Sequence, residues 1–177
     1  MLRLRKKHSR PTEPAPHPVD AQRLIDAQSL RRAALASVSL AILLNVVWLW
    51  LSNVTGSFFH WYSLLQGPLI GVGVQRAGRG IDWRFPLLAA CVALVAAFSG
   101  NFLVSLMTTS TVLGVSAPQV LQGLTAWTWQ TWYAEVLSPV DLIYALAAAA
   151  IAAFYSRRRL SRQEIFALRT MPEDRKQ

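Results

Sequence analysis

The chain has little cysteine, histidine and charge, and each shortage excludes a class of protein or site. Cys91 is the single cysteine, which excludes an intramolecular disulfide and a multi-cysteine metal or iron–sulfur site. Charged residues make up 15% of the 177 residues, whereas soluble domains usually carry about 25%. The three histidines, at positions 8, 17 and 60, do not form the pair of membrane histidines that a haem would require.

Apolar residues, at 53%, lie in long uncharged runs. The net charge of +9 is compatible with nucleic-acid binding, but the cations lie at the ends of these runs, so we expect a membrane protein without a nucleic-acid partner. A spanning helix needs about 20 apolar residues. The sequence predicts an all-α polytopic membrane protein, an antiparallel bundle of four transmembrane helices at about 33–51, 59–74, 85–107 and 139–155.

The distribution of cations predicts the orientation of these spans. All 18 Lys and Arg residues fall within 1–32, 75–84 and 157–176, and the two remaining loops contain none. Basic residues near spans stay on the cytoplasmic side. We therefore expect both termini in the cytoplasm and a bacterial inner-membrane location. The first apolar run is interpreted as an uncleaved anchor, because the basic region before it is too long for a signal peptide.

Three regions are expected: a disordered basic and proline-rich leader (1–18), a membrane domain (19–156) and a basic cytoplasmic tail (157–177). The loop before the last span is predicted to hold a helix at about 118–136 on the outer membrane surface, either as a simple connection or as a partner-docking or lid element. Ser161 and Glu164 form a capping box that predicts an amphipathic tail helix on the inner leaflet.

Residues at the span ends suit the membrane interface. Tryptophans are expected to form an aromatic belt, with Trp83 on the inner side. Arginines on the inner side are expected to bind anionic lipid headgroups. The outer tryptophans are Trp48, Trp50, Trp61, Trp127, Trp129 and Trp132, and the headgroup-binding arginines are Arg76, Arg79, Arg84, Arg157, Arg158 and Arg159.

Small residues in the second and fourth spans predict close helix packing. Gly67, Gly71 and Gly73 would let another backbone approach, and Pro68 would kink the span. A broken helix lining a substrate path is the alternative. In the last span Ala145 and 147–150, which include Ala147 and Ala150, would also allow a close approach.

Polar residues inside the apolar runs are candidate sites. Asn45, Gln66 and Asn101 are expected to make interhelical hydrogen bonds, with a ligand or quinone contact as the alternative for the two asparagines. Ser138 and Asp141 are expected to cap the last span around Pro139. Alternatively, Asp141 is an intramembrane carboxylate for protons or ions, or it joins Glu135 and His60 in an outer metal site.

The segment 71–80 reads GVGVQRAGRG. Through Val72, Gly73, Arg76, Gly78 and Gly80 it resembles small bacterial four-span inner-membrane proteins with a glycine-rich second helix, and the start of the last span at 138–142 is compatible with that resemblance. The resemblance covers roughly the last three spans and implies the four-span fold, but it carries no activity. The glycines lack the strand–turn–helix context of a phosphate-binding loop.

No nucleophile–base pair, metal-ligand motif or buried acid–base dyad is evident in the sequence. We therefore expect a non-enzymatic protein without a cofactor. It would be an accessory or scaffolding component of a membrane assembly that contacts a membrane-protein partner or a second copy. The alternative is a small oligomeric transporter or channel, which predicts that Asn45, Gln66, Asn101 and Asp141 face one wet cavity.

Overall fold

The computed structural model describes residues 18–136 and 138–170, so residues 1–17 of the predicted leader (1–18) and the residues after 170 lie outside this description. The described residues are helical and include no strand, which confirms the all-α prediction. The helices are α1 (Pro18–Asp26), α2 (Leu30–Thr55), α3 (Tyr62–Gly78), α4 (Arg84–Leu113), α5 (Ala117–Gly123), α6 (Ala126–Val136), α7 (Pro139–Tyr155) and α8 (Arg162–Thr170).

The chain divides into two compact units, and residues 28–158 form the larger one. The smaller unit brings α1 and α8 together although they lie at opposite ends of the sequence. Ala21 of α1 and Ala167 of α8 are buried there, and Ile25 and Leu168 pack against them. The predicted tail helix therefore has a partner helix that the sequence did not indicate.

Local sequence signals set the helix ends in the larger unit. The backbone N–H of Arg32 donates to Ser29 Oγ over 3.3 Å, which caps the start of α2. Gly56 and Gly114 follow the last residues of α2 and α4 with φ of 62° and 66°. This left-handed conformation is one that glycine adopts without a steric penalty, so both helices stop there.

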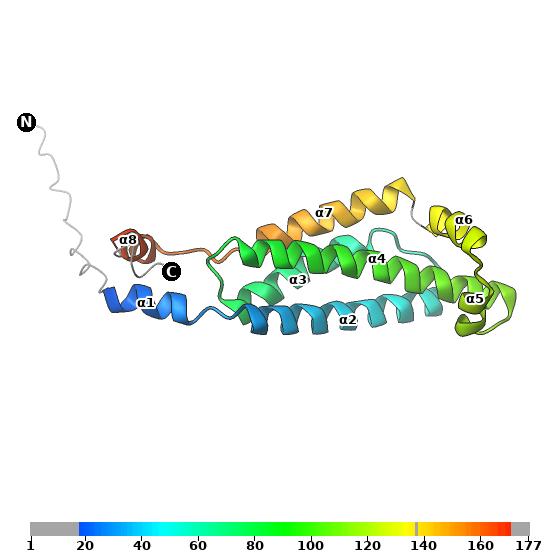
Figure 1. Ribbon diagram of the computed structural model, residues 1–177, viewed down its shortest axis with the longest axis horizontal. Coiled ribbons are helices and arrows are strands. Elements are labelled where there is room, and N and C mark those ends of the chain that lie inside the picture. Colours follow the sequence, from blue (N-terminus) through cyan, green and yellow to red (C-terminus); the bar gives the residue numbers. More distant parts are fainter. Residues whose placement is uncertain (1–17, 137, 171–177) are drawn as a thin grey trace, which may run out of the picture. The chain divides into compact units, whose positions relative to one another are not determined.

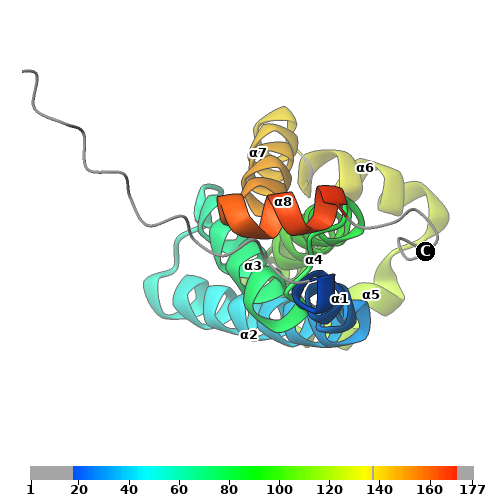
Figure 2. The same ribbon diagram turned by 90° about the vertical axis from the view of Figure 1, so that its left-hand side faces the viewer.

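Four of these helices, α2, α3, α4 and α7, pack as a bundle (Figure 1). The helices α2 and α4 run in one direction, and α3 and α7 run in the other. Each of α3 and α4 contacts the other three bundle helices, whereas the described residues of α2 and α7 do not meet. Seen from the end, α3 and α4 therefore lie between α2 and α7 (Figure 2).

Most residues buried in the bundle are small or polar, joined by a few large side chains such as Ile70 and Phe85, and many large apolar residues face outward. On α2, Leu35 and Ile42 are 62% and 61% exposed, whereas Ser37 and Ala41 are buried. Further exposed large side chains on α4 and α7 include Leu87, Val95, Ile143, Leu146 and Phe154. By length and composition, two helical segments are able to cross a membrane, Ala21–Thr55 and Arg84–Leu113, and Pro139–Tyr155 is a shorter apolar helix.

Two expectations about the outer end need correction. The single helix expected at 118–136 is two helices, α5 and α6, because the chain leaves the helical conformation at Leu124. Trp48 is not an interfacial belt residue, because its side chain is fully buried in the bundle. Its ring stacks on Tyr62 with 5.0 Å between centroids, and it packs against Gly100, where a β-carbon would come within 2.5 Å of the indole.

Candidate functional site

A chain of buried side-chain hydrogen bonds crosses the middle of the bundle. Gln66 Nε2 on α3 donates to Asn45 Oδ1 on α2 over 2.8 Å. Asn45 Nδ2 donates in turn to Ser99 Oγ on α4 over 2.9 Å, and the Ser99 hydroxyl donates to Val95 O within its own helix. The network therefore ties three helices together through one asparagine, which is the interhelical role expected for Asn45 and Gln66.

The interior also holds polar atoms without a hydrogen-bond partner among the described residues. These atoms are Gln66 Oε1, Asn101 Oδ1, Trp48 Nε1 and Ser52 Oγ. An unpartnered buried polar atom is costly. Gln66 belongs to the hydrogen-bonded chain described above, and Asn101 and Trp48 lie within one helical turn of Ser99 and Asn45. Ser52 lies one turn beyond Trp48, towards the end of α2.

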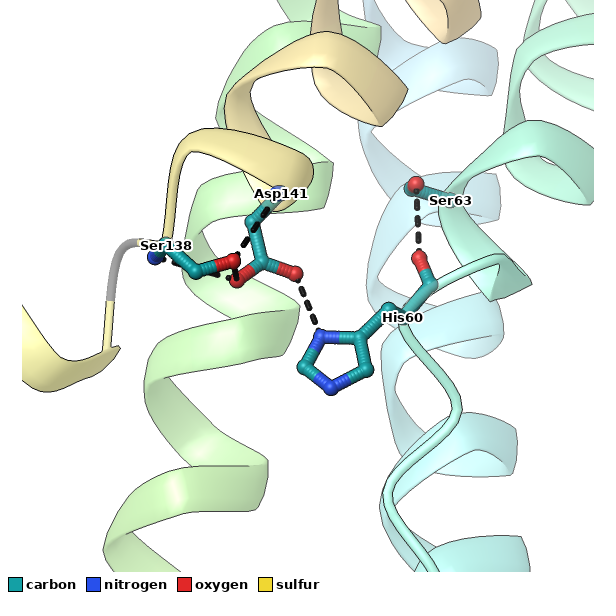
Figure 3. A network of polar contacts seen from close by, with 4 residues as sticks. All are labelled: His60, Ser63, Ser138 and Asp141. Carbon is teal, nitrogen blue, oxygen red and sulfur yellow. Dashed lines mark hydrogen bonds and ion pairs between the residues drawn. The ribbon is translucent and has the colours of Figure 1, made fainter.

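At the end of the bundle that lacks Lys and Arg, a buried carboxylate joins α7 to the loop before α3. Asp141 Oδ1 lies 2.7 Å from His60 Nδ1 (Figure 3). The other oxygen, Oδ2, accepts from the Ser138 hydroxyl over 2.8 Å and from the Ser138 backbone N–H over 3.2 Å. Asp141 therefore caps α7, as the sequence predicts, and also binds a residue 81 positions away in sequence.

The two partners of this ion pair differ in exposure. The Asp141 side chain is 1% exposed and the His60 side chain is 47% exposed. His60 also contacts Phe58 at 4.4 Å between ring centroids, and its backbone carbonyl accepts from the Ser63 hydroxyl (Figure 3). Because the carboxylate holds Nδ1, the imidazole has a fixed orientation, and Nε2 points away from Asp141. An imidazole nitrogen can bind a metal ion, but within the described residues no three His, Cys, Asp or Glu side chains gather as metal ligands.

The glycines of α3 divide between two neighbours. A β-carbon on Gly67 would lie 2.5 Å from Ala148 O, and one on Gly71 would lie 2.6 Å from Ala152 O, so both glycines lie against the backbone of α7. Gly73 faces Leu40 of α2 instead, at 3.1 Å. On α7 the buried small residues are Ala145, Ala148, Ala149 and Ala152, which follow the helical repeat from Asp141.

Ala147 is half-buried and Ala150 is exposed, because both fall outside that repeat. They are therefore not packing residues within this chain, unlike the four buried alanines of α7.

The opposite end of the bundle carries the cations. The backbone N–H of Ser29 donates to Gly78 O, and Gln75 Nε2 donates to Arg157 O, so the start of α2 and the ends of α3 and α7 meet there. Phe85 packs against Gly78 and Gly80, where a β-carbon would clash with its ring. Of the proposed headgroup ligands in this unit, Arg76, Arg79, Arg84 and Arg157 are exposed and Arg158 is half-buried, and Arg159 is an exposed residue of the smaller unit.

A cavity of about 410 Å³ lies between the last turns of α2 and α4, beside the loop at 56–58. Its lining includes Ser52, Asn53, Thr108 and Thr111, together with Phe58 and Met107. None of Asn45, Gln66, Asn101 and Asp141 lines it. In a single copy, the four polar residues therefore do not share this space.

Comparison with protein-family models, curated proteins and solved structures finds no match.

Sequence reasoning missed two features of these sites. Ser99 was not singled out, although it lies two positions before Asn101 in the same uncharged run. The pairing of His60 with Asp141 was weighed as part of a metal site that also contained Glu135, whose side chain lies outside the described part of the structure. No local pattern signals either contact, because both depend on the relative register of helices far apart in sequence.

Proposed function

We propose that this chain is a multi-pass membrane protein in which α2, α3, α4 and α7 cross the bilayer, with the Lys- and Arg-containing end of the bundle in the cytoplasm. The observation that carries the proposal is the radial distribution of side chains. A water-soluble bundle buries most of its large apolar residues. Here most of the buried residues are alanine, glycine or polar, with a few large side chains such as Trp48, Ile70 and Phe85 among them. Leu35, Ile42 and Val95 face outward instead. Such a surface suits hydrocarbon.

Helix lengths support the same arrangement. At about 1.5 Å per residue, the 26 residues of α2 and the 30 residues of α4 exceed the hydrocarbon thickness of about 30 Å. The 17 residues of α3 and of α7 lie at the short end of the spanning range, which begins at about 17 residues. The contact between the half-exposed His60 and the buried Asp141 joins the start of α7 to the loop before α3, at one end of these two short helices.

Within the membrane, the proposed role is that of a non-enzymatic accessory or scaffolding component. The support comes from how the buried polar groups are used: Asn45, Gln66 and Asp141 make hydrogen bonds within the chain. The apolar faces of α2 and α7 each lack the fourth bundle helix as a neighbour. They are the surfaces on which a membrane-protein partner or a second copy would bind.

A cysteine scan tests the spanning arrangement. Cys91 is exposed on α4, so it is first replaced by Ala. Single cysteines are then placed at exposed positions before, between and after the helices: Arg32, Thr55, Arg76, Gln122 and Arg159. In intact cells an impermeant maleimide should label Thr55→Cys and Gln122→Cys, and the other three should react only after permeabilisation. Labelling of Arg76→Cys from outside would overturn the four-span arrangement.

The accessory role is tested by purification from native membranes in mild detergent at chromosomal expression level. The expected result is a stoichiometric complex with a membrane protein or with a second copy, identified by quantitative mass spectrometry. A monodisperse monomer would contradict scaffolding. Solute flux into liposomes containing only this protein would instead support the transporter alternative.

A further inference from the structure

The cavity between the last turns of α2 and α4 is separate from the polar layer of the bundle and from the His60–Asp141 pair. It lies where α4 continues past the start of α7 (Figure 1). Its volume of about 410 Å³ falls within the range of small-molecule sites, about 300–1,000 Å³. Under the proposed four-span arrangement, on which this inference rests, the cavity lies at the outer membrane interface.

The hydrogen-bonding groups of the lining require a ligand that both accepts and donates. Ser52 is 92% buried, since 8% of its surface is exposed, and its hydroxyl has no partner among the described residues. Its proton has no acceptor within the described residues, so a rotation of the side chain about χ1 would present it to an acceptor in the cavity. Thr108 and Thr111 already donate to backbone carbonyls, at 2.9 Å to Val104 O and 2.7 Å to Thr108 O. Their lone pairs remain available to a donor, and a hydroxyl group is the chemical group that serves both needs.

The electrostatics of the cavity disfavour an anion. The lining contains no charged side chain, so a charged group there would lose hydration without a counter-ion. The cavity also lies at the carboxyl ends of α2 and α4, where the helix dipole contributes partial negative charge. A phosphate or carboxylate would be repelled there.

Apolar residues complete the lining and indicate a ligand with a hydrocarbon part. Leu49, Phe58 and Met107 contribute apolar surface, and the neighbouring Val54 and Leu113 are 64% and 62% exposed on the outside of the bundle. We propose that this cavity binds an uncharged hydroxylated headgroup, a glycerol or a sugar, carried on an apolar chain. Such a lipid headgroup and a free polyol both present neighbouring hydroxyl groups. The apolar surface of the cavity favours the lipid.

The test uses the full-length protein in phosphatidylcholine nanodiscs and an octyl glucoside analogue with a diazirine in its alkyl chain. Irradiation should crosslink peptides containing residues 49–58 or 104–112. Octyl glucoside should compete, whereas octyl sulfate, which is anionic, should not. Competition by free glucose at an equal concentration would show that the chain is dispensable and would overturn the lipid assignment.

Matched variants test the hydroxyl contacts. Ser52→Ala and Thr108→Val should each weaken competition about fivefold, as expected for one hydrogen bond. Thr109→Val is the control, because its hydroxyl donates to Ser105 O and the residue does not line the cavity. It should change competition less than twofold. Equal effects of Thr108→Val and Thr109→Val would contradict the proposed contact.

Failure of this inference and failure of the four-span proposal are distinguishable. The cysteine scan described above is run in intact cells, where an impermeant reagent distinguishes the two sides of the membrane, and crosslinking is measured separately in nanodiscs. If Thr55→Cys and Arg76→Cys report opposite sides but crosslinking is spread evenly along the chain, the binding site is wrong and the spanning arrangement stands. If both cysteines report the same side, the spanning arrangement is wrong, and specific crosslinking would then have to be explained without it.

Discussion

The interface between α3 and α7 and the interface between α2 and α4 are made by different kinds of contact. The first is a contact between backbones, since a β-carbon at Gly67 or Gly71 would meet carbonyl oxygens of α7 at 2.5 and 2.6 Å. The second is made by side chains: Asn45 bonds to Ser99, and Trp48 packs on Gly100. The second interface also borders a cavity of about 410 Å³ and unpartnered atoms of Trp48 and Ser52.

This difference indicates that the two interfaces have different roles in the bundle. Under the proposed four-span arrangement the helices are surrounded by lipid, where there is little hydrophobic driving force between them. Close van der Waals contact between small residues would then provide much of the association energy. The α3–α7 interface meets that requirement and fixes the two short helices against each other. The α2–α4 interface retains space and unused hydrogen-bonding capacity at the end where both helices stop, so it is less tightly packed than the α3–α7 interface.

The largest effect is expected from adding a methyl group at the glycine contact between α3 and α7. Gly67→Ala places a methyl group against the backbone of Ala148, which cannot rotate away. We expect a loss of about 1–3 kcal/mol in the free energy of unfolding, the usual cost of overpacking. The measurement is reversible unfolding by sodium dodecyl sulfate in mixed micelles, followed by circular dichroism.

Gly73→Ala is the matched control on the same helix. Its nearest neighbour is the flexible Leu40 side chain at 3.1 Å, and alanine has the higher helix propensity. Stability should stay unchanged or rise. Equal destabilisation by the two substitutions would show that the backbone contact with α7 is not what limits Gly67.

The outer end of the α3–α7 pair tests whether a polar contact adds to the glycine contact. His60→Ala, Asp141→Asn and the double variant form a thermodynamic cycle. We expect a coupling energy of about 1–2 kcal/mol, because the hydrogen bond is charge-assisted but His60 is half-exposed. Asp141→Asn also weakens the cap between Asp141 and Ser138. That loss is present in both the single Asp141 variant and the double variant, so it cancels in the coupling energy. Additive effects would mean that the 2.7 Å contact contributes nothing to stability.

The sequence predicted the helical class and the last bundle helix best. For α7 the observed bounds are the predicted ones, 139–155, because Ser138 and Pro139 mark its start and a run of arginines follows its end. The helix α2 extends beyond the predicted 33–51 at both ends, since Ser29 and Gly56 rather than hydropathy determine where it begins and stops. The break between α5 and α6 follows Gly123, a signal that the helical spacing of the tryptophans concealed.

For the candidate sites, the sequence identified residues but not their partners. Asn45 and Gln66 stood out as polar residues in apolar runs, yet the bond between them depends on how α2 and α3 are rotated. Trp48 was expected at the interface because tryptophan is common there, but the glycine opposite it, Gly100, provides the room that admits the ring to the core. Such complementarity joins residues about fifty positions apart and leaves no periodic pattern in either helix.

A smaller effect is expected at Gly100, the glycine of the α2–α4 interface. In Gly100→Ala the new methyl group would come within 2.5 Å of the Trp48 ring. The obstacle is a side chain, and the neighbouring Val104 and Ser52 line a cavity into which the packing can relax. We expect a loss of about 1 kcal/mol, near the lower end of overpacking costs, in the same unfolding assay. A loss larger than that of Gly67→Ala would reverse the ranking of the two interfaces.

The smallest effect should come from Ser99→Ala. The substitution removes the acceptor of Asn45 Nδ2 and also the back-bond from Ser99 to Val95 O. Hydrogen bonds between membrane helices contribute about 0.6 kcal/mol on average, because the separated helices find other partners. We therefore expect a loss of about 0.6 kcal/mol, measured against Thr109→Val, which removes only an intrahelical bond to Ser105 O. A loss above about 2 kcal/mol would exceed the range measured for such bonds. The polar layer would then stabilise the α2–α4 interface as strongly as glycine packing stabilises α3 against α7.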